Sequence, residues 1–321
     1  MTSSSNYKVT IVGAGAVGSA TAFALASAGI AREIVLFDVN LKRAQAEQLD
    51  IMHGSLFYPT VDIRATGDGE DAEHSDVVVI TAGARQKPGQ TRLDLAGDTI
   101  EIMQNLLPSL VKVAPDAIYL VVANPVDIVT YVCQEICGLS HSQVFGSGTV
   151  LDSSRLRTLL AERTGVNSKS IHAYIAGEHG DSEIPLWSSA TIGNIGLLDY
   201  KAMPGFEPLT AKVRDDVCKM VVDSAYRVID GKGVTNYAIA LACVDIITCI
   251  ARDERRIMPL STRIENVEGI ENVCMSLPLV VGGSGIVSQL EPSLSTDELI
   301  GLQSSAAFLS ETLVNFGYRD S

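Results

Sequence analysis

The first half of the chain alternates short apolar runs with longer runs that have helical spacing. The apolar runs include KVTIV at 8–12 and EIVLF at 33–37, and the helical runs include SATAFALASAG at 19–29 and LKRAQAEQLDIMHG at 41–54. Strands that alternate with helices in this way build a parallel sheet with helices on both of its faces. The pattern therefore predicts an α/β fold, with a doubly wound parallel sheet domain over residues 1–147.

The pattern changes in the second half of the chain, over residues 148–321. Here we expect a helix at 153–165, alternating strands around 170–183, a long helix at about 208–230 and glycine-punctuated strands near 256–290. Helices and strands no longer alternate regularly. This half is predicted to be a mixed α+β domain.

Composition limits the classes of function. The chain has 321 residues, a formal net charge of -14, 46% hydrophobic residues and 19% charged residues, which is typical of a soluble globular protein with a large core. Nucleic acids and anionic membranes are bound mainly through pooled Lys and Arg charge, which an acidic chain does not offer. We expect neither as a partner.

Targeting signals and cysteine usage point to the cytoplasm. The opening MTSSSNY is polar and has no apolar signal core, and apolar stretches such as VVVITAGA stop short of the roughly 20 residues that span a bilayer. The six cysteines include no CxxC pair. We expect buried free thiols and a cytoplasmic protein.

A glycine-rich motif lies between the first predicted strand and helix. Gly13, Gly15 and Gly18 form GAGAVG, and Asp38 ends the next strand, 20 residues after Gly18. Glycines at these positions let backbone amides and a helix N-terminus approach a pyrophosphate, while the carboxylate accepts hydrogen bonds from ribose hydroxyls and repels a 2′-phosphate. The combination predicts a Rossmann-type domain that binds NAD rather than NADP. The alternative is a simple turn, with Asp38 capping the following helix.

Asn124 follows another predicted strand, in VVANP. The carboxyl ends of parallel strands gather around the ligand crevice, so the Asn124 amide is expected near the nicotinamide and the substrate. The alternative is a turn asparagine before Pro125.

Three residues of the second half are candidates for chemistry. In LDSSRLR, Asp152 and Arg155 are three residues apart at a predicted helix start and share one face, although Asp152 would also serve as a helix cap. His179, in AGEHGDSE, lies where a strand runs into a glycine-flanked loop that can present a reactive imidazole. A metal site is not expected, because only His179 and Asp181 are plausible ligands there. A serine hydrolase is not expected either, because the chain has no GxSxG nucleophile elbow.

Six motifs together give the chain a family resemblance. GAGAVG, ARQKPGQTR, ANP, LDSSRLR, GEHGDSE and GVTNYAIAL follow one another in the order and approximate spacing of the lactate/malate dehydrogenase family. The chain resembles the family's L-lactate enzymes, which implies reversible hydride transfer between NADH and pyruvate, giving lactate and NAD.

The resemblance assigns roles to the candidate catalytic residues. It implies that His179 donates and accepts the proton and that Asp152 is its buried partner. Arg155 would grip the substrate carboxylate, a task that suits a planar fork of donors. Arg92 would polarise the reacting carbonyl as negative charge develops on its oxygen. Because Pro88 and Gly89 give the loop before Arg92 a turn, that loop is expected to act as a hinged lid.

Gln86 bears on substrate choice. The family's malate enzymes carry arginine at this position and its lactate enzymes carry glutamine. A second substrate carboxylate, as in malate, would face a neutral amide in a closed site, and an uncompensated buried ion costs several kcal/mol. We therefore expect pyruvate and lactate to be preferred over oxaloacetate and malate.

Further positions are assigned by the resemblance alone. Val17 and Gly83 would line the cofactor site, Thr235 would border the pocket for the substrate methyl group, and Ile239 would face the nicotinamide. Thr235 and Ile239 are four residues apart, which is the spacing of one helical turn, and they would look the same as plain core residues.

An effector site is a further hypothesis. Arg157 and His172 match positions that bind fructose 1,6-bisphosphate between subunits in allosteric bacterial relatives, and the family implies a homotetramer. An arginine on a helix and a histidine on a strand also need no ligand.

Two other functions stay open at this point. One is a relative that acts on malate or on a bulkier L-2-hydroxy acid. The other is an inactive dinucleotide-binding protein that has kept the fold without catalysis.

Overall fold

The computed structural model describes residues 7–84 and 92–319, except for the side chains of residues 92–94. The strands are β1 (Lys8–Val12), β2 (Glu33–Phe37), β3 (Asp62–Thr66), β4 (Val77–Ile80), β5 (Ile118–Val121), β6 (Val144–Gly146), β7 (Ile171–His172), β8 (Ile175–Ala176), β9 (Ile184–Pro185), β10 (Thr191–Ile192), β11 (Ile195–Gly196), β12 (Arg256–Arg263), β13 (Cys274–Gly282) and β14 (Gly285–Gln289). The helices are α1 (Ala16–Ala28), α2 (Leu41–His53), α3 (Arg92–Val113), α4 (Val126–Cys137), α5 (Val150–Thr164), α6 (Ala211–Lys232), α7 (Tyr237–Ala251) and α8 (Thr296–Asn315).

The largest sheet has nine strands in the order β14-β13-β12-β6-β5-β4-β1-β2-β3. The six strands from β3 to β6 pair in parallel, whereas β12, β13 and β14 add antiparallel pairs at one end. The order β3-β2-β1-β4-β5-β6 is that of a Rossmann-type doubly wound sheet. The fold class predicted from the alternating pattern is therefore confirmed.

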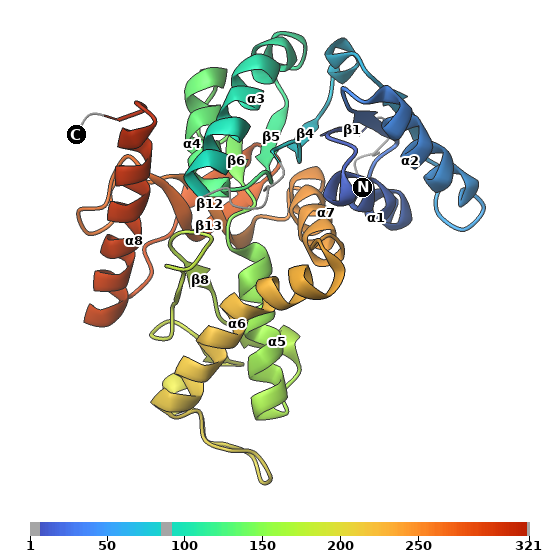
Figure 1. The fold of residues 1–321 in the computed structure, drawn as a ribbon. Coiled ribbons are helices and arrows are strands. Elements are labelled where there is room, and N and C mark those ends of the chain that lie inside the picture. Colours follow the sequence, from blue (N-terminus) through green and yellow to red (C-terminus); the bar gives the residue numbers. More distant parts are fainter. Residues whose placement is uncertain (1–6, 85–91, 320–321) are drawn as a thin grey trace.

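Helices cover both faces of the parallel strands, and the strand sequences show why. Val9 and Ile11 of β1 pack into a core that contains residues of α1 and α7, whereas Val12 packs into a second core that contains residues of α3 and α4. Successive side chains of a strand point to opposite faces, so a strand such as β1, with apolar residues on both faces, is buried on both. Figure 1 shows α3 and α4 on the opposite side of the strands from α1 and α7.

The parallel topology places a ligand crevice at a defined point. The chain leaves β1 for β2 on one side and later returns to β4 on the other side of β1. In open α/β sheets, ligands bind at the carboxyl ends of the strands where the strand order reverses. That point lies beside the segments that follow β1 and β4.

Part of the second half of the chain, from α5 to α6, builds a smaller mixed lobe. A three-stranded sheet has the order β11-β10-β7, and β8 pairs with β9 in an antiparallel two-stranded sheet. The residues between β8 and β9 include His179. Leu156 and Leu160 of α5 pack with Val217 and Val221 of α6 in the core of this lobe. Figure 1 shows α5 and α6 side by side below the main sheet.

The last helix, α8, begins with a capping box. The Ser295 side chain accepts from the Glu298 N–H, and the Glu298 carboxylate accepts from the Ser295 N–H. Leu302, Leu309 and Leu313 are buried in the core that α8 shares with α4 and β13. These buried leucines pack α8 against the rest of the fold.

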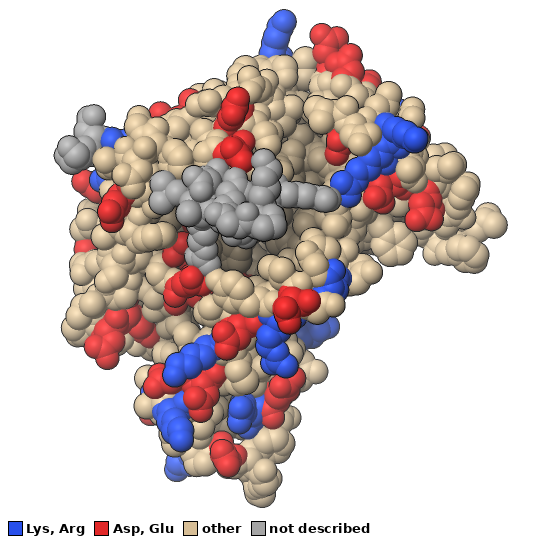
Figure 2. All heavy atoms as spheres, viewed as in Figure 1, with Lys and Arg blue, Asp and Glu red and all other residues tan. Residues whose placement is uncertain are grey.

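Charges on the face shown in Figure 2 are interspersed rather than pooled. Lys and Arg side chains alternate with Asp and Glu over the lower part of that face, where α5 and α6 lie. Of the helices in the described ranges, none is both long enough and apolar enough to cross a membrane.

Candidate functional site

The glycine segment after β1 needs two of its glycines for steric reasons. Gly13 has a φ of 102°, and a Cβ at Gly18 would lie 1.9 Å from the Gly13 carbonyl oxygen. A positive φ disfavours any residue with a side chain, and a Cβ that close to backbone cannot be accommodated without moving it. These two glycines let β1 turn directly into α1.

Gly15 is suited to its position for a different reason. It precedes α1 with a φ of -75°, and a Cβ there would meet nothing within 4 Å. Among the described residues, no side chain caps the start of α1. The first amides of a helix have no partner within the helix and favour an anion such as a pyrophosphate. Gly15 is therefore not needed to relieve a clash in the fold, and its lack of a side chain leaves space open beside these amides.

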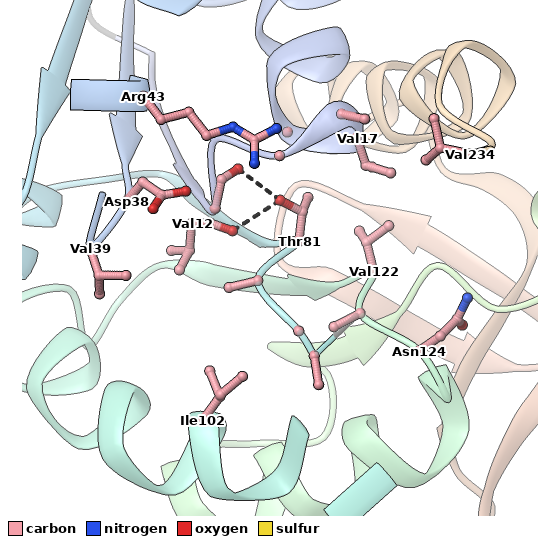
Figure 3. Close-up of a pocket in the computed structure, with 18 of the residues that line it drawn as sticks. Val12, Val17, Asp38, Val39, Arg43, Thr81, Ile102, Val122, Asn124 and Val234 are labelled. Atoms are coloured by element: carbon pink, nitrogen blue, oxygen red, sulfur yellow. Dashed lines mark hydrogen bonds between the residues drawn. The ribbon is translucent and has the colours of Figure 1, made fainter. Parts of the chain in front are cut away.

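A cavity of about 1350 Å³ runs along this segment. Its described lining residues come from the ends of β1 and β2, from the segments after β1, β2, β4 and β5, from α1, α2, α3 and α6, and from the stretch that joins α6 to α7. Gly13, Gly15, Val17, Gly18, Asp38, Gly83, Asn124 and Thr235 are among them. Figure 3 shows Asp38 and Val39 on one side of the cavity, with Val17, Val234 and Asn124 on the other. An elongated cavity with a helix N-terminus in its wall fits a dinucleotide.

Asp38 is held by backbone amides. Its Oδ2 accepts from the Ala14 N–H at 2.7 Å, and its Oδ1 accepts from the Asn40 N–H at 2.8 Å. Asn40, not Asp38, caps α2, because the Asn40 side chain accepts from the Arg43 N–H. The helix-cap alternative for Asp38 is therefore wrong. Each carboxylate oxygen has a further lone pair for a ribose hydroxyl.

Arg43 and Thr81 are cavity residues that the sequence patterns did not reveal. Figure 3 shows the Arg43 side chain extending from α2 over the cavity, in the direction of Val17. The Thr81 hydroxyl lies 3.0 Å from the carbonyl oxygens of both Val12 and Gly13, which ties the end of β4 to the glycine segment. The available signal for Arg43 was only a cation five residues after Asp38, next to a second cation, Lys42.

The second half of the site is a charged cluster built around Asp152. His179 Nδ1 lies 2.6 Å from Asp152 Oδ2, and Arg155 NH1 donates to Asp152 Oδ1 at 2.6 Å. The side chain of Asp152 is 3% exposed, compared with 27% for His179 and 17% for Arg155. Asp152 and Arg155 lie in the first two turns of α5, and His179 reaches them from the loop between β8 and β9. The structure thus brings together residues that lie up to 27 positions apart.

The charges in this cluster support one another. Burial alone would lower the pKa of His179, but the Asp152 carboxylate, with its charge and its hydrogen bond, raises that pKa to about 9. Burial would raise the pKa of Asp152, but His179 and Arg155 hold it below its usual value. At neutral pH the cluster therefore contains an imidazolium, a guanidinium and a carboxylate.

A second aspartate holds the His179 backbone. Asp127, in the first turn of α4, accepts from the His179 N–H at 2.7 Å and from the Ser261 hydroxyl at 2.6 Å. Burial raises the pKa of Asp127 to about 6, although both hydrogen bonds oppose that shift. This contact fixes the loop that presents the imidazole. No sequence signal distinguished Asp127, because it depends on a contact across 52 residues.

Glu183 is a further acidic residue in the cluster. One ligand atom each of Asp152, His179 and Glu183 lies within 4.8 Å of the others. The sequence offered only His179 and Asp181 as plausible metal ligands here, but the Asp181 carboxylate accepts from the Tyr226 hydroxyl at 2.9 Å. Arg155 binds Asp152 directly, and this fixed positive charge opposes a metal cation in the same place.

The remaining predicted residues are placed as follows. Gln86 lies outside the described residues, and Arg92 is described only as the first residue of α3. The spacing of Thr235 and Ile239 suggested that they share a helix. Thr235 instead lies two residues before α7, which contains Ile239. Ile239 packs against the core that includes Val17.

The two predicted effector residues are neighbours. Arg157 NH2 lies 3.5 Å from His172 Nδ1, and the Arg157 Nε also donates to the Ile171 carbonyl oxygen. They come from α5 and β7, on the lobe that lies away from the large cavity. This contact fits an effector site, and it fits a purely structural role equally well.

Family models match both halves of the chain. Residues 7–146 match the NAD-binding domain of lactate/malate dehydrogenases, and residues 149–316 match the α/β C-terminal domain of the same enzymes. The chain belongs to the lactate/malate dehydrogenase family. The family predicted from the six motifs is thereby confirmed, as is NAD as the cofactor.

Relatives within the family cover nearly the whole chain. An L-lactate dehydrogenase of Bifidobacterium animalis subsp. lactis is 54% identical over 97% of both chains, and one of Clostridium botulinum is 45% identical over 96% of both. A lactate dehydrogenase from a Medee basin deep-sea metagenome library has a TM-score of 0.93 and 36% identity, covering 98% of this chain and 99% of its own. The minor L-lactate dehydrogenase of Enterococcus mundtii has a TM-score of 0.90 and 33% identity, covering 97% and 98%.

Proposed function

We propose that the protein is an NAD-dependent L-lactate dehydrogenase in which His179 is the acid and base. The activity is supported by the curated relatives, which are L-lactate dehydrogenases and match this chain over almost their full length. The residue roles rest on one observation above all, the contact of His179 and Arg155 with the same buried Asp152 carboxylate. Binding of a dinucleotide alone requires none of these three residues.

His179 supplies the proton for pyruvate reduction. Because its pKa is raised to about 9, it is protonated at neutral pH and can donate as the carbonyl oxygen gains negative charge. The Asp152 carboxylate accepts the hydrogen bond from Nδ1, which leaves Nε2 as the nitrogen that faces the substrate. In lactate oxidation the neutral imidazole accepts the hydroxyl proton.

Two arginines hold the substrate. Arg155 has five N–H donors, of which NH1 donates to Asp152, and its planar fork suits a carboxylate. Arg92 begins α3, six residues after Gln86 in the sequence, and it is proposed to polarise the carbonyl. Thr235 lines the cavity and is proposed to border the substrate methyl group.

The cofactor cavity determines where the redox chemistry takes place. Bound NADH supplies the hydride, and bound NAD accepts it. Gly15 and the start of α1 are proposed to hold the pyrophosphate, and Asp38 the adenosine ribose. Val17, Gly83, Asn124 and Ile239 are proposed to place the nicotinamide, since the first three line the cavity and Ile239 packs in the same core as Val17.

Substitutions in the glycine segment are expected to separate folding from cofactor binding. Gly18→Ala places a Cβ 1.9 Å from the Gly13 carbonyl oxygen, so we expect a loss of about 2 to 3 kcal/mol in the free energy of unfolding. Gly15→Ala meets nothing within 4 Å, so its Tm is expected to stay within about 2 °C of wild type while its Kd for NADH rises about tenfold. Thermal unfolding and NADH fluorescence titration measure the two effects. Equal losses of stability in both variants would contradict this division of roles.

Arg157 and His172 are proposed to form half of an effector site for fructose 1,6-bisphosphate between subunits of a homotetramer. The two side chains approach within 3.5 Å, and a guanidinium beside a hydrogen-bonding imidazole suits a phosphate group. We expect the sugar bisphosphate to lower the KM for pyruvate about tenfold in the wild type, and to have no effect on Arg157→Gln. Pyruvate saturation curves with and without the effector test this, with Arg163→Gln, on the same helix, as the matched control. Wild-type curves that do not respond would remove the proposal.

A substrate panel tests the function as a whole. NADH oxidation is followed with pyruvate, oxaloacetate and a bulkier 2-oxo acid, and pyruvate is expected to give the highest kcat/KM because Gln86 leaves a second carboxylate unpaired. Preference for oxaloacetate would identify a malate enzyme, and no oxidation with any of the three acids would favour the inactive binding protein.

We propose the cytoplasm as the site of action. All six cysteines are free in the structure, which is typical of a reducing compartment. Fractionation of cells that express the chain would test this placement.

A further inference from the structure

Glu183 is buried next to the catalytic pair without a visible partner for one of its oxygens. The residue is 8% exposed, and its Oε1 has no hydrogen-bond partner among the described residues. A carboxylate oxygen and the ligand atoms of Asp152 and His179 all lie within 4.8 Å of one another. A buried ion without hydrogen bonds is unfavourable, whereas a neutral carboxylic acid in the same place is tolerated far better.

We propose that Glu183 is a positioning residue that stays protonated at neutral pH and loses its proton under alkaline conditions, when its charge weakens the hold of the site on pyruvate. It acts through Asp152, His179 and Arg155 rather than by touching the substrate. The inference rests on the proposed role of His179 and adds a second titrating group to the same reaction.

The charges that face Glu183 favour the protonated form. Burial and the nearby Asp152 carboxylate raise the pKa of Glu183 to about 8, Glu178 adds to the rise, and His179 and Arg155 oppose it. From α6, the Cys218 thiol also faces Glu183. The Glu178 carboxylate is occupied by the Ser182 hydroxyl, which donates to Oε2 at 2.5 Å. Asp127 influences the cluster indirectly, because it accepts the hydrogen bond from the His179 N–H.

The proton on Glu183 matters because Asp152 already serves two cations. Both its oxygens are engaged, one by His179 and one by Arg155. An ionised Glu183 would add a second carboxylate beside those cations and compete with the substrate carboxylate for the charge of Arg155. It would also stabilise the imidazolium and so make His179 a weaker acid. A neutral Glu183 leaves both cations available to a monoanion.

The two titrating groups should give pyruvate reduction a steep alkaline limb. His179 has a pKa of about 9 and Glu183 of about 8, and because they interact their protons leave in two steps that belong to the pair. The logarithm of kcat/KM should therefore fall with a slope that approaches -2 as pH rises beyond both steps. A single acid would give a slope of -1.

Glu183→Gln keeps the shape of the side chain and removes its titration. At pH 6 to 7 we expect kcat/KM within about threefold of wild type, since the amide resembles the neutral acid. Above pH 9 the slope should become -1. The fraction of its pH 6 kcat/KM that the variant retains should then be about tenfold larger than the fraction that the wild type retains. The KM should change more than kcat. Glu162→Gln, the same change at an exposed position of α5, is the matched control and should follow the wild-type profile.

Other outcomes would overturn the proposal. Parallel profiles for Glu183→Gln and wild type would show that Glu183 does not titrate in this range, and an equal loss at every pH would show a purely structural role. If the variant does not fold, infrared difference spectra of the wild type between pH 7 and pH 10 decide instead, because the proposal requires loss of a carboxylic acid band. His179→Asn tests the underlying function separately, since activity retained in that variant would refute the acid and base assignment whatever Glu183 does.

Discussion

His179→Asn is expected to lower kcat for pyruvate reduction by about 10³-fold to 10⁴-fold, the upper part of the range for general acid catalysis. Asparagine cannot donate a titratable proton, and it also removes the positive charge that Asp152 stabilises. The backbone N–H that donates to Asp127 stays in place, so the loop between β8 and β9 should keep its position. Stopped-flow measurement of NADH oxidation at saturating pyruvate gives the size of the loss.

Cofactor binding provides the control for this variant. His179 is not among the described residues that line the large cavity, so the Kd for NADH is expected to stay within about twofold of wild type. Asp152→Asn should lose activity for a different reason, because an amide no longer stabilises the imidazolium and leaves Arg155 without its carboxylate. A His179→Asn enzyme that kept more than about a tenth of wild-type kcat would exclude His179 as the proton donor.

The fold was predictable from sequence because its signals are local. Short, largely apolar strands that are buried at each position, such as β1 and β4, have to be covered on both faces, and the helices between them follow. Gly13 and Gly18 are equally local, since both are needed where a strand turns directly into a helix. The antiparallel continuation of the sheet by β12 was not predicted, because its single bridge from Ser261 to Gly146 joins distant segments.

The candidate site was predictable only in part. His179, Asp152 and Arg155 belong to motifs that carry the family resemblance, and the structure brings the three together. Asp127 lies two residues after ANP and Glu183 is the last residue of GEHGDSE, but the environment of both is set by tertiary contacts. Glu183 is four residues after His179, and nothing in GEHGDSE distinguishes a solvated carboxylate from a buried one.

Boundaries were the least predictable feature. Spacing suggested that Thr235 and Ile239 share a helical turn, whereas α7 begins at Tyr237. Both Asp38 and Asn40 are good helix caps, and only the hydrogen bond from the Arg43 N–H shows which one is used. Local preference left these choices open, and tertiary contacts decided them.

Gln86→Arg is expected to reverse the substrate preference from pyruvate toward oxaloacetate. Arginine would pair with the second carboxylate of the dicarboxylic acid, which otherwise stays uncompensated in a closed site at a cost of several kcal/mol. A difference of about 4 kcal/mol corresponds to roughly a thousandfold, so the ratio of kcat/KM for oxaloacetate to that for pyruvate should rise about 10³-fold. Steady-state kinetics on both acids, for the variant and the wild type, measure that ratio directly.

The matched control is Gln90→Arg, the same change four residues further along the same segment. If general attraction between a more basic segment and a dianion were the cause, both variants would gain activity on oxaloacetate, and the gain would fade at high salt because exposed charges are screened. A paired charge inside a closed site is screened much less, so the Gln86→Arg ratio should hold at 0.5 M salt while that of Gln90→Arg stays near wild type. An unchanged preference in Gln86→Arg would refute the charge argument, and substrate choice would then have to come from the shape of the pocket beside Thr235 rather than from charge balance.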